Sequence, residues 1–184
     1  MTRSTDARTA NLLGALSTTL AGRAGDLVDE RAELAASDAA ALVTLDNYAE
    51  GESLDLLRGA LGLSHAATVR LADRLEARGL LERRRGDDDR RSVGLWLTAA
   101  GHAAAARALA ARAAAIAPAL AALEPAERRA LAALAAKMLA AQTTDAEASR
   151  WICRLCDPVA CGHPRRCPVT IAAMALPGAI TRRG

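Results

Sequence analysis

The chain of 184 residues is long enough for one domain of ordinary size and a small additional module. Hydrophobic residues make up 52% of it and aromatic residues only 2%, which favours helices packed through small side chains and argues against a β-rich core. The formal net charge of +3 excludes a nucleic-acid binder that relies on overall charge, so any DNA contact must come from a local concentration of arginine.

The sequence predicts a cytoplasmic protein with no membrane contact. Residues 1–6 contain no apolar run, so we expect no signal peptide. The alanine-rich stretch 103–123 has the length of a membrane span, but Arg107, Arg112 and Pro118 interrupt it, and we expect a helix of a soluble protein.

The first predicted helix covers residues 8–34 and carries a narrow apolar stripe. Leucine recurs there every seven residues, at Leu13, Leu20, Leu27 and Leu34. Such a stripe needs a partner, which is either the rest of its own domain or a second copy of the chain.

Three short helices are predicted next, each after a serine that can cap its N-terminus. They cover residues 38–47 after Ser37, 54–61 after Ser53, and 65–78 after Ser64. Gly62 provides a tight turn between the last two, which together form a helix-turn-helix unit.

The helix predicted at 65–78 has the two faces that a recognition helix needs. Its inward face is expected to consist of Thr68, Leu71, Ala72 and Leu75, at helical spacing. The DNA contacts expected near it are Ser64, His65, Ala66, Val69, Arg70 and Arg74. Arg70 can donate two hydrogen bonds to guanine, apolar side chains can meet thymine methyl groups, and the helix N-terminus can approach a phosphate. The alternative is an ordinary surface helix, because such units also occur in proteins that bind no DNA.

Residues 80–97 predict a β-hairpin wing. Apolar and small or polar residues alternate over 92–97, and the run Gly86-Asp-Asp-Asp89 is typical of a turn. Five arginines lie on this hairpin, at positions 83, 84, 85, 90 and 91. A wing of this kind can place Arg84 and Arg91 at the minor groove, with Asp89 orienting Arg91; the alternative is a solvated, charge-balanced turn.

Two further helices complete the predicted domain. Thr98 can cap a helix that ends near Pro118, and Pro125 suits the first turn of a helix that reaches Gln142. The face formed by Leu131, Leu134 and Met138 is expected to pack with the leucine stripe of the first helix in a two-fold dimer. The predicted fold is therefore mainly α with a small β-hairpin wing.

Two stretches together carry a family resemblance. They are Leu61-Gly-Leu-Ser with Arg74-Leu-Glu-Ala-Arg-Gly79-Leu, and Asp89-x-Arg91-x-x-x-Leu95-x-Leu97-Thr98-x-x-Gly101. They resemble the MarR family of transcriptional regulators over about residues 10–142. The chain departs from the family pattern at Arg58, where a small residue is usual, and at Thr68, where valine is usual.

The resemblance implies a winged helix-turn-helix protein that acts as a homodimer on a pseudo-palindromic operator, usually as a repressor. It implies that Arg91 reaches the minor groove and that Asp89 positions it. Residues 8–142 would form this domain, with a DNA-binding core at 37–98 and dimerisation helices at 8–34 and 99–142. Many members bind aromatic acids below the wing, but this chain offers few aromatic residues there, so we leave a small-molecule effector unassigned.

All four cysteines fall within residues 144–170, which we expect to form a separate cysteine-rich module before a tail at 171–184. The pattern is Cys153-x2-Cys156-x4-Cys161-x-His163-x3-Cys167. In a reducing compartment such a cluster predicts a metal site rather than a disulfide framework.

The expected metal is a structural Zn²⁺ held by the four cysteines, with His163 as an alternative ligand. An iron–sulfur cluster also uses four cysteines, although the spacing matches neither common ferredoxin pattern. A third possibility is a metal-free set of thiols that responds to oxidation.

No catalytic constellation or phosphate loop is visible, so we expect no enzyme. The main prediction is a DNA-binding transcriptional regulator whose cysteine site is structural or sensory. The competing prediction is a redox or iron–sulfur protein that uses the winged helix for protein contacts.

Overall fold

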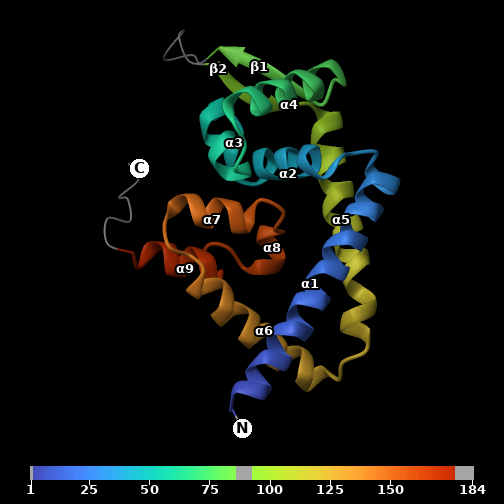
Figure 1. Ribbon diagram of the computed structural model, residues 1–184. Helices are drawn as coiled ribbons and strands as arrows, with labels where there is room; N and C mark the ends of the chain where they lie inside the picture. The colour runs from blue at the N-terminus through green and yellow to red at the C-terminus, as the bar shows by residue number, and fades with distance from the viewer. Residues whose placement is uncertain (1, 86–92, 177–184) are drawn as a thin grey trace.

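The protein was analysed as a computed structural model that describes residues 2–85 and 93–176. Two long helices, α1 (Thr2–Ala32) and α5 (Ala99–Ala121), lie side by side along the molecule (Figure 1). The buried face of α5 consists of small residues, which let the helices approach closely: Gly101, Ala104, Ala105, Ala108, Ala111 and Ala115. By length and composition α5 could cross a membrane, but core helices of soluble proteins pass the same test, and this one packs against α1 and α2.

The leucine stripe of α1 divides into two parts. Leu34, just beyond the helix, is 1% exposed in the core and Leu27 packs against that core, whereas Leu13 is 45% exposed. The C-terminal half of the stripe therefore packs within the domain, whereas the N-terminal half stays exposed.

The helix-turn-helix consists of α3 (Leu54–Leu61) and α4 (His65–Ala77), which pack on the buried helix α2 (Ala36–Thr44). Gly62 forms the turn with φ +63°, a conformation that favours glycine. Ser64 caps α4 as predicted, because its hydroxyl accepts a hydrogen bond from the Ala67 amide at 3.3 Å.

One predicted cap, Ser37, is wrong, and a second, Ser53, is confirmed in position but not in its hydrogen bond. Ser37 lies inside α2, which begins at Ala36 with Ala35 as its N-cap. Ser53 does precede α3, but among the described residues its side chain makes no capping hydrogen bond. A single-turn π-helix, η1 (Leu45–Ala49), continues α2 and was not predicted.

The wing is an antiparallel pair of strands, β1 (Leu81–Arg85) and β2 (Val93–Leu97). The predicted hairpin is confirmed, and in its register Leu81 pairs with Leu97 and Arg85 with Val93. Backbone bonds from the loop after η1 extend the pairing, because the Gly51 amide donates to the Leu95 carbonyl at 2.7 Å. The tip of the wing, including Asp89, Arg90 and Arg91, lies outside the described residues.

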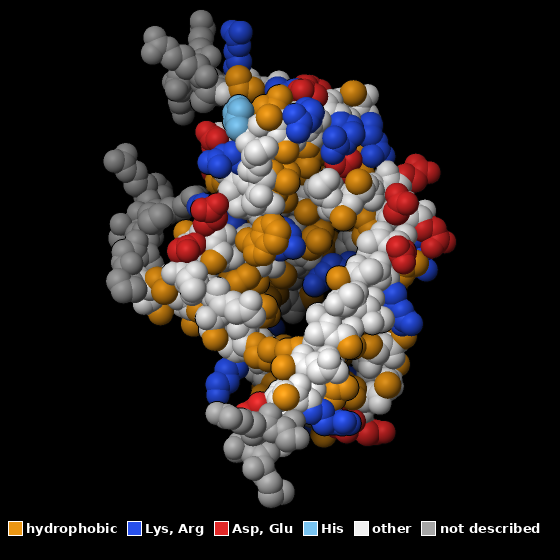
Figure 2. Space-filling model, in the orientation of Figure 1, with side chains coloured by type: hydrophobic (Ala, Val, Ile, Leu, Met, Phe, Trp, Pro, Cys, Tyr) orange, Lys and Arg blue, Asp and Glu red, His pale blue; other side chains and the backbone are white. Residues whose placement is uncertain are grey.

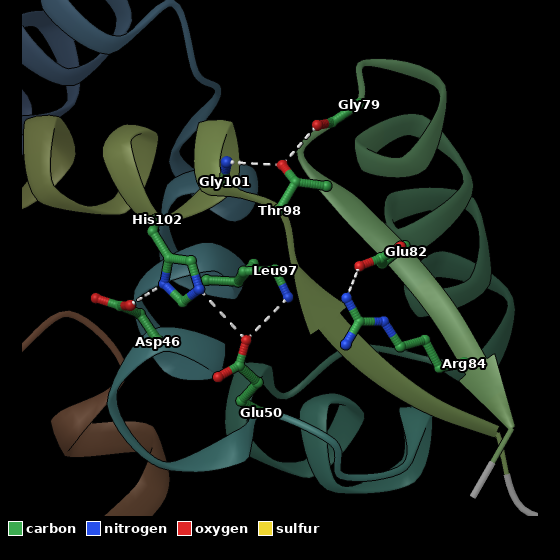
Figure 3. A network of polar contacts seen from close by, with 9 residues as sticks. All are labelled: Asp46, Glu50, Gly79, Glu82, Arg84, Leu97, Thr98, Gly101 and His102. Atoms are coloured by element: carbon green, nitrogen blue, oxygen red, sulfur yellow. Dashed lines mark hydrogen bonds and ion pairs between the residues drawn. The ribbon is translucent and has the colours of Figure 1, made fainter.

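Thr98 joins the wing to α5. Its hydroxyl donates to the Gly79 carbonyl at 2.7 Å and accepts from the Gly101 amide at 3.0 Å (Figure 3). A Cβ on Gly101 would lie 2.0 Å from the Leu80 carbonyl oxygen, so glycine is required at this close approach.

The C-terminal region begins with α6 (Pro125–Ala141) and ends in three short helices. These are α7 (Ala146–Cys153), α8 (Pro158–Cys161) and α9 (Pro168–Met174), where α7 packs on α3 and α9 packs on α6 (Figure 1). The run Thr144-Asp-Ala-Glu147 predicts a capping box with Thr144 as the cap of α7. The cap is instead Asp145, whose carboxylate accepts from the Ala148 amide at 2.7 Å. A capping box is present instead at the start of α6, between Glu124 and Glu127.

Candidate nucleic-acid interface and cysteine cluster

The two predicted faces of α4 are confirmed. The inward residues Thr68, Leu71, Ala72 and Leu75 are all buried. Thr68 satisfies its hydroxyl by donating to the Ser64 carbonyl at 3.0 Å, which explains how a polar residue is accommodated in the core. Of the outward residues, His65, Ala66 and Arg70 are exposed and Val69 is half-buried.

Arg74 has a partner within the protein. Its guanidinium donates two hydrogen bonds to Asp38 of α2, at 3.2 and 2.5 Å, and this carboxylate is only 2% exposed. The hydrogen bond to Asp38 raises the pKa of Arg74 above its ordinary value. Arg74 therefore holds the recognition helix against α2, and its expected DNA contact stays a prediction.

Two arginines of strand β1, Arg83 and Arg84, make different contacts. Arg83 forms ion pairs with Asp73 at 2.7 Å and with Glu76, which fastens the wing to α4. The Arg84 guanidinium lies 5.2 Å from the centre of the Trp96 ring. It also pairs with Glu82 on the same strand (Figure 3). Arginine side chains gather over α4 and the wing at the upper end of the molecule (Figure 2). The described residues among the predicted DNA contacts lie at the N-cap of α4, on α4 and on β1.

A polar network that was not predicted links η1, the wing and α5. His102 Nδ1 lies 2.6 Å from an Asp46 oxygen, and His102 Nε2 lies 3.4 Å from Glu50 (Figure 3). The same Glu50 oxygen accepts from the Leu97 amide at 3.3 Å. His102 lies 56 residues from Asp46 in sequence, so no local pattern identifies this contact.

The four cysteines are brought together at the ends of the three short C-terminal helices. Cys153 ends α7, Cys156 follows it, Cys161 ends α8, and Cys167 precedes α9. All four are free thiols and, together with His163, line one cavity of about 460 Å³.

The thiols interact as two pairs. The hydrogen bond with Cys153 lowers the pKa of Cys156 to about 6, aided by the charges of Arg112 and Arg154. The same hydrogen bond, together with burial, raises the pKa of Cys153 far above its usual value. Cys161 and Cys167 form the second pair: burial and this contact raise the pKa of Cys161 to about 11. Burial also tends to raise the pKa of Cys167, but hydrogen bonds, chiefly from Thr170, lower it overall.

The geometry does not support the expected single zinc ion. Within residues 2–85 and 93–176, no three or more His, Cys, Asp or Glu side chains converge on one ion position. His163 Nδ1 lies 2.9 Å from the Thr170 hydroxyl, and its role as an alternative ligand stays a prediction.

The cysteine module is docked on the end of α2, on η1 and on the turn of the helix-turn-helix. The side chains of Asn47, Tyr48 and Thr44 donate to the backbone carbonyls of Cys156, Arg150 and Arg154 at 2.7, 3.2 and 3.3 Å. The Trp151 ring packs at Gly62, where a Cβ would lie 3.2 Å from it. The three hydrogen bonds span more than a hundred residues of sequence, so periodicity gave no signal for them.

A family model described as MarR family matches residues 37–93. The transcriptional repressor MprA of Escherichia coli (strain K12) is 47% identical to this chain over 64 residues. These residues cover 34% of this chain and 36% of MprA, so the chain matches about a third of that relative's length.

Solved structures extend the likeness beyond the family-model match. RV1404 from Mycobacterium tuberculosis has a TM-score of 0.61 and 30% identity, over 72% of this chain and 91% of that one. The Mycobacterium tuberculosis MarR family protein Rv2887, in complex with DNA, has a TM-score of 0.59 and 23% sequence identity. The match covers 70% of this chain and 95% of the Rv2887 chain. These matches confirm the winged-helix fold.

Proposed function

The chain belongs to the MarR family, whose members are transcription regulators rather than enzymes, and on that premise we propose that it is a sequence-specific DNA-binding regulator acting as a homodimer. The observation that carries this proposal is the recognition helix α4. Its inward face is fully buried, its N-terminus is capped, and Arg70 projects from its exposed face. That arrangement presents a guanidinium to base edges from a rigid helix.

The wing supplies the second contact. Arg84 and Arg85 are exposed on strand β1 beside α4, while Arg83 holds the hairpin in place. A hairpin held beside the recognition helix is suited to contact the adjacent minor groove. The proposed roles of Asp89 and Arg91 follow from the family pattern. Rv2887, with the same fold, is described in complex with DNA.

A homodimer would cover the exposed apolar surface of α1 and α6. None of the residues of α6, all of which are described, is buried, although Leu131, Leu134 and Met138 form an apolar face. Leu12, Leu13 and Leu16 are similarly exposed on α1. Two copies related by a two-fold axis could bury both faces and place two recognition helices about 10 bp apart on a pseudo-palindromic operator.

Repression is the proposed sense of regulation, in line with the description of MprA as a repressor. The proposed site of action is the cytoplasm. We also propose that the four cysteines form a metal site that organises the C-terminal module, since residues 144–176 contain few buried apolar side chains to fold it: Cys167 and Val169 are the buried hydrophobic residues described there.

Selection of bound duplexes from a random DNA pool, followed by titration of the winning sequence at several salt concentrations, tests the DNA-binding proposal. We expect a pseudo-palindromic sequence, and an affinity that falls linearly with the logarithm of salt concentration. Recovery of no sequence above background, at low salt and with folded dimeric protein, would contradict the proposal.

A further inference from the structure

Helix α6 is held to the rest of the chain mainly by the cysteine module. Within residues 2–85 and 93–176, α9 is the one element that packs extensively on α6. The short turn at residues 122–124 joins α6 to α5, and no residue of α6 is buried. Because α6 carries the apolar face of the proposed dimer, the contact that holds α9 also determines where this face points.

The other end of the module is fixed to the DNA-binding core, which consists of α2, η1, α3, α4 and the wing. Helix α7 packs on α3, and α7 and α9 pack on each other, so the module lies between α6 and the core (Figure 1). At Gly59 of α3, a Cβ would lie 3.5 Å from the Glu147 side chain of α7. A continuous path of packed helices therefore runs from α6 through α9 and α7 to α3.

The contacts between module and core are made to backbone groups and to the buried core, which fixes the position of the module. The Tyr48 hydroxyl donates to the Arg150 carbonyl, one of the last four carbonyls of α7, which have no partner within the helix. The hydroxyl of Thr44, a fully buried residue, donates to the Arg154 carbonyl at 3.3 Å. Leu155 packs against the hydrophobic core.

Helix η1 connects the module to the wing and to α5. On the module side, Asn47 donates to the Cys156 carbonyl at 2.7 Å. On the other side, Asp46 and Glu50 both contact His102 of α5, and Glu50 also accepts a hydrogen bond from a backbone amide of β2 (Figure 3). A movement of the module would therefore reach the wing as well as α3.

We propose that the cysteine module determines which half-site spacing the protein recognises, because it holds the DNA-binding core at one angle to α6. This inference rests on the proposed function, a homodimer that binds DNA. In a two-fold dimer formed through α1 and α6, the separation of the two recognition helices depends on this angle. One extra base pair between half-sites rotates one of them by about 35° and moves it by about 3.4 Å, so a rigidly held core matches a narrow range of spacings.

The first test measures the orientation of α4 relative to α6 in the full chain without DNA. Residual dipolar couplings of backbone amides in the two helices should fit one rigid arrangement in the wild type. They should cease to fit it in the double variant Asn47→Ala with Trp151→Ala, which removes one contact to η1 and the ring that packs at Gly62. Wild-type couplings that need two independent orientations, or variant couplings that keep the wild-type arrangement, would overturn the proposal.

The second test measures affinity for operators that differ only in the number of base pairs between their half-sites. The wild type should prefer one spacing, and the double variant should lose about five-fold or more of that preference, the lower range for coupled sites. Val159→Ala is the matched control, since it changes an 86% exposed residue of the same module, and it should keep the wild-type preference.

The single variant Asn47→Ala keeps the test valid if circular dichroism shows that the double variant has lost helix. It should give a preference between those of the wild type and the double variant. An unchanged spacing preference in Asn47→Ala and in the folded double variant would overturn the proposal. If no form of the protein binds DNA, the proposed function fails, whereas the dipolar couplings still decide whether the module holds the core at a fixed angle.

Discussion

Gly101→Ala should destabilise the protein even though alanine is a better helix former than glycine. The new Cβ would lie 2.0 Å from the Leu80 carbonyl oxygen, whereas ordinary contact begins near 3.4 Å, so the start of α5 must move by about 1.4 Å. That movement strains two hydrogen bonds that depend on the same geometry: Thr98 amide to Leu80 carbonyl at 3.2 Å, and Gly101 amide to Thr98 hydroxyl at 3.0 Å.

The expected loss follows from these contacts. Overpacking costs about 1–3 kcal/mol, and a weakened N-cap and a strained hydrogen bond each cost about 1 kcal/mol. The gain in helix propensity returns about 0.5–1 kcal/mol. We therefore expect the free energy of unfolding to fall by about 2–4 kcal/mol.

Urea unfolding at a fixed protein concentration measures this loss, because a dimer gains stability with concentration. Gly59→Ala is the matched control: it also lies in a helix, but its Cβ would meet only the flexible Glu147 side chain at 3.5 Å. We expect the free energy of unfolding of Gly59→Ala to equal that of the wild type or to exceed it by up to about 1 kcal/mol. A Gly101→Ala protein as stable as Gly59→Ala would refute the close-approach argument.

Three further predictions concern the DNA-binding surface and the dimer. Arg70→Ala should weaken operator binding by about 1–3 kcal/mol and relax sequence preference in a gel shift; unchanged selectivity would exclude base reading by this residue. Arg74→Ala should lower the free energy of unfolding by about 1–3 kcal/mol, because it leaves the 2% exposed Asp38 without its main partner; equal stability with weaker DNA binding would instead indicate a phosphate contact. Leu134→Glu should produce monomers in sedimentation. Val159→Glu, which changes an 86% exposed residue of α8, should leave the protein dimeric. A dimeric Leu134 variant would place the interface elsewhere.

Local patterns were sufficient for most of the helices and for the wing. The spacing of Thr68, Leu71, Ala72 and Leu75 identified the buried face of α4, because a helix brings residues three and four apart onto one side. Alternation over Val93–Leu97 gave the strand and its pairing with β1. The same reasoning misplaced the caps of α2 and α7, since several neighbouring residues could cap each helix and packing selects among them.

Long-range contacts decided the roles of individual side chains. In the sequence, Arg74 and Arg83 look like further DNA contacts. In the structure Arg74 pairs with Asp38 of α2, and Arg83 of β1 pairs with Asp73 of α4. The residues next to an arginine in sequence do not show which acidic side chain it meets in the fold. Counting charges therefore cannot tell an arginine that pairs within the protein from one that contacts DNA.

By itself the sequence determined the winged helix, the face of α4 that is exposed, and the gathering of four cysteines in one short segment, because each depends on residues close together in the chain. The tertiary structure alone decided which half of the α1 leucine stripe is buried, that the four cysteines line one cavity, and that the cysteine module rests on η1 and on the turn at Gly62. Those features depend on how helices far apart in sequence pack against one another, and a pattern within one helix shows that it needs a partner without showing which partner it meets.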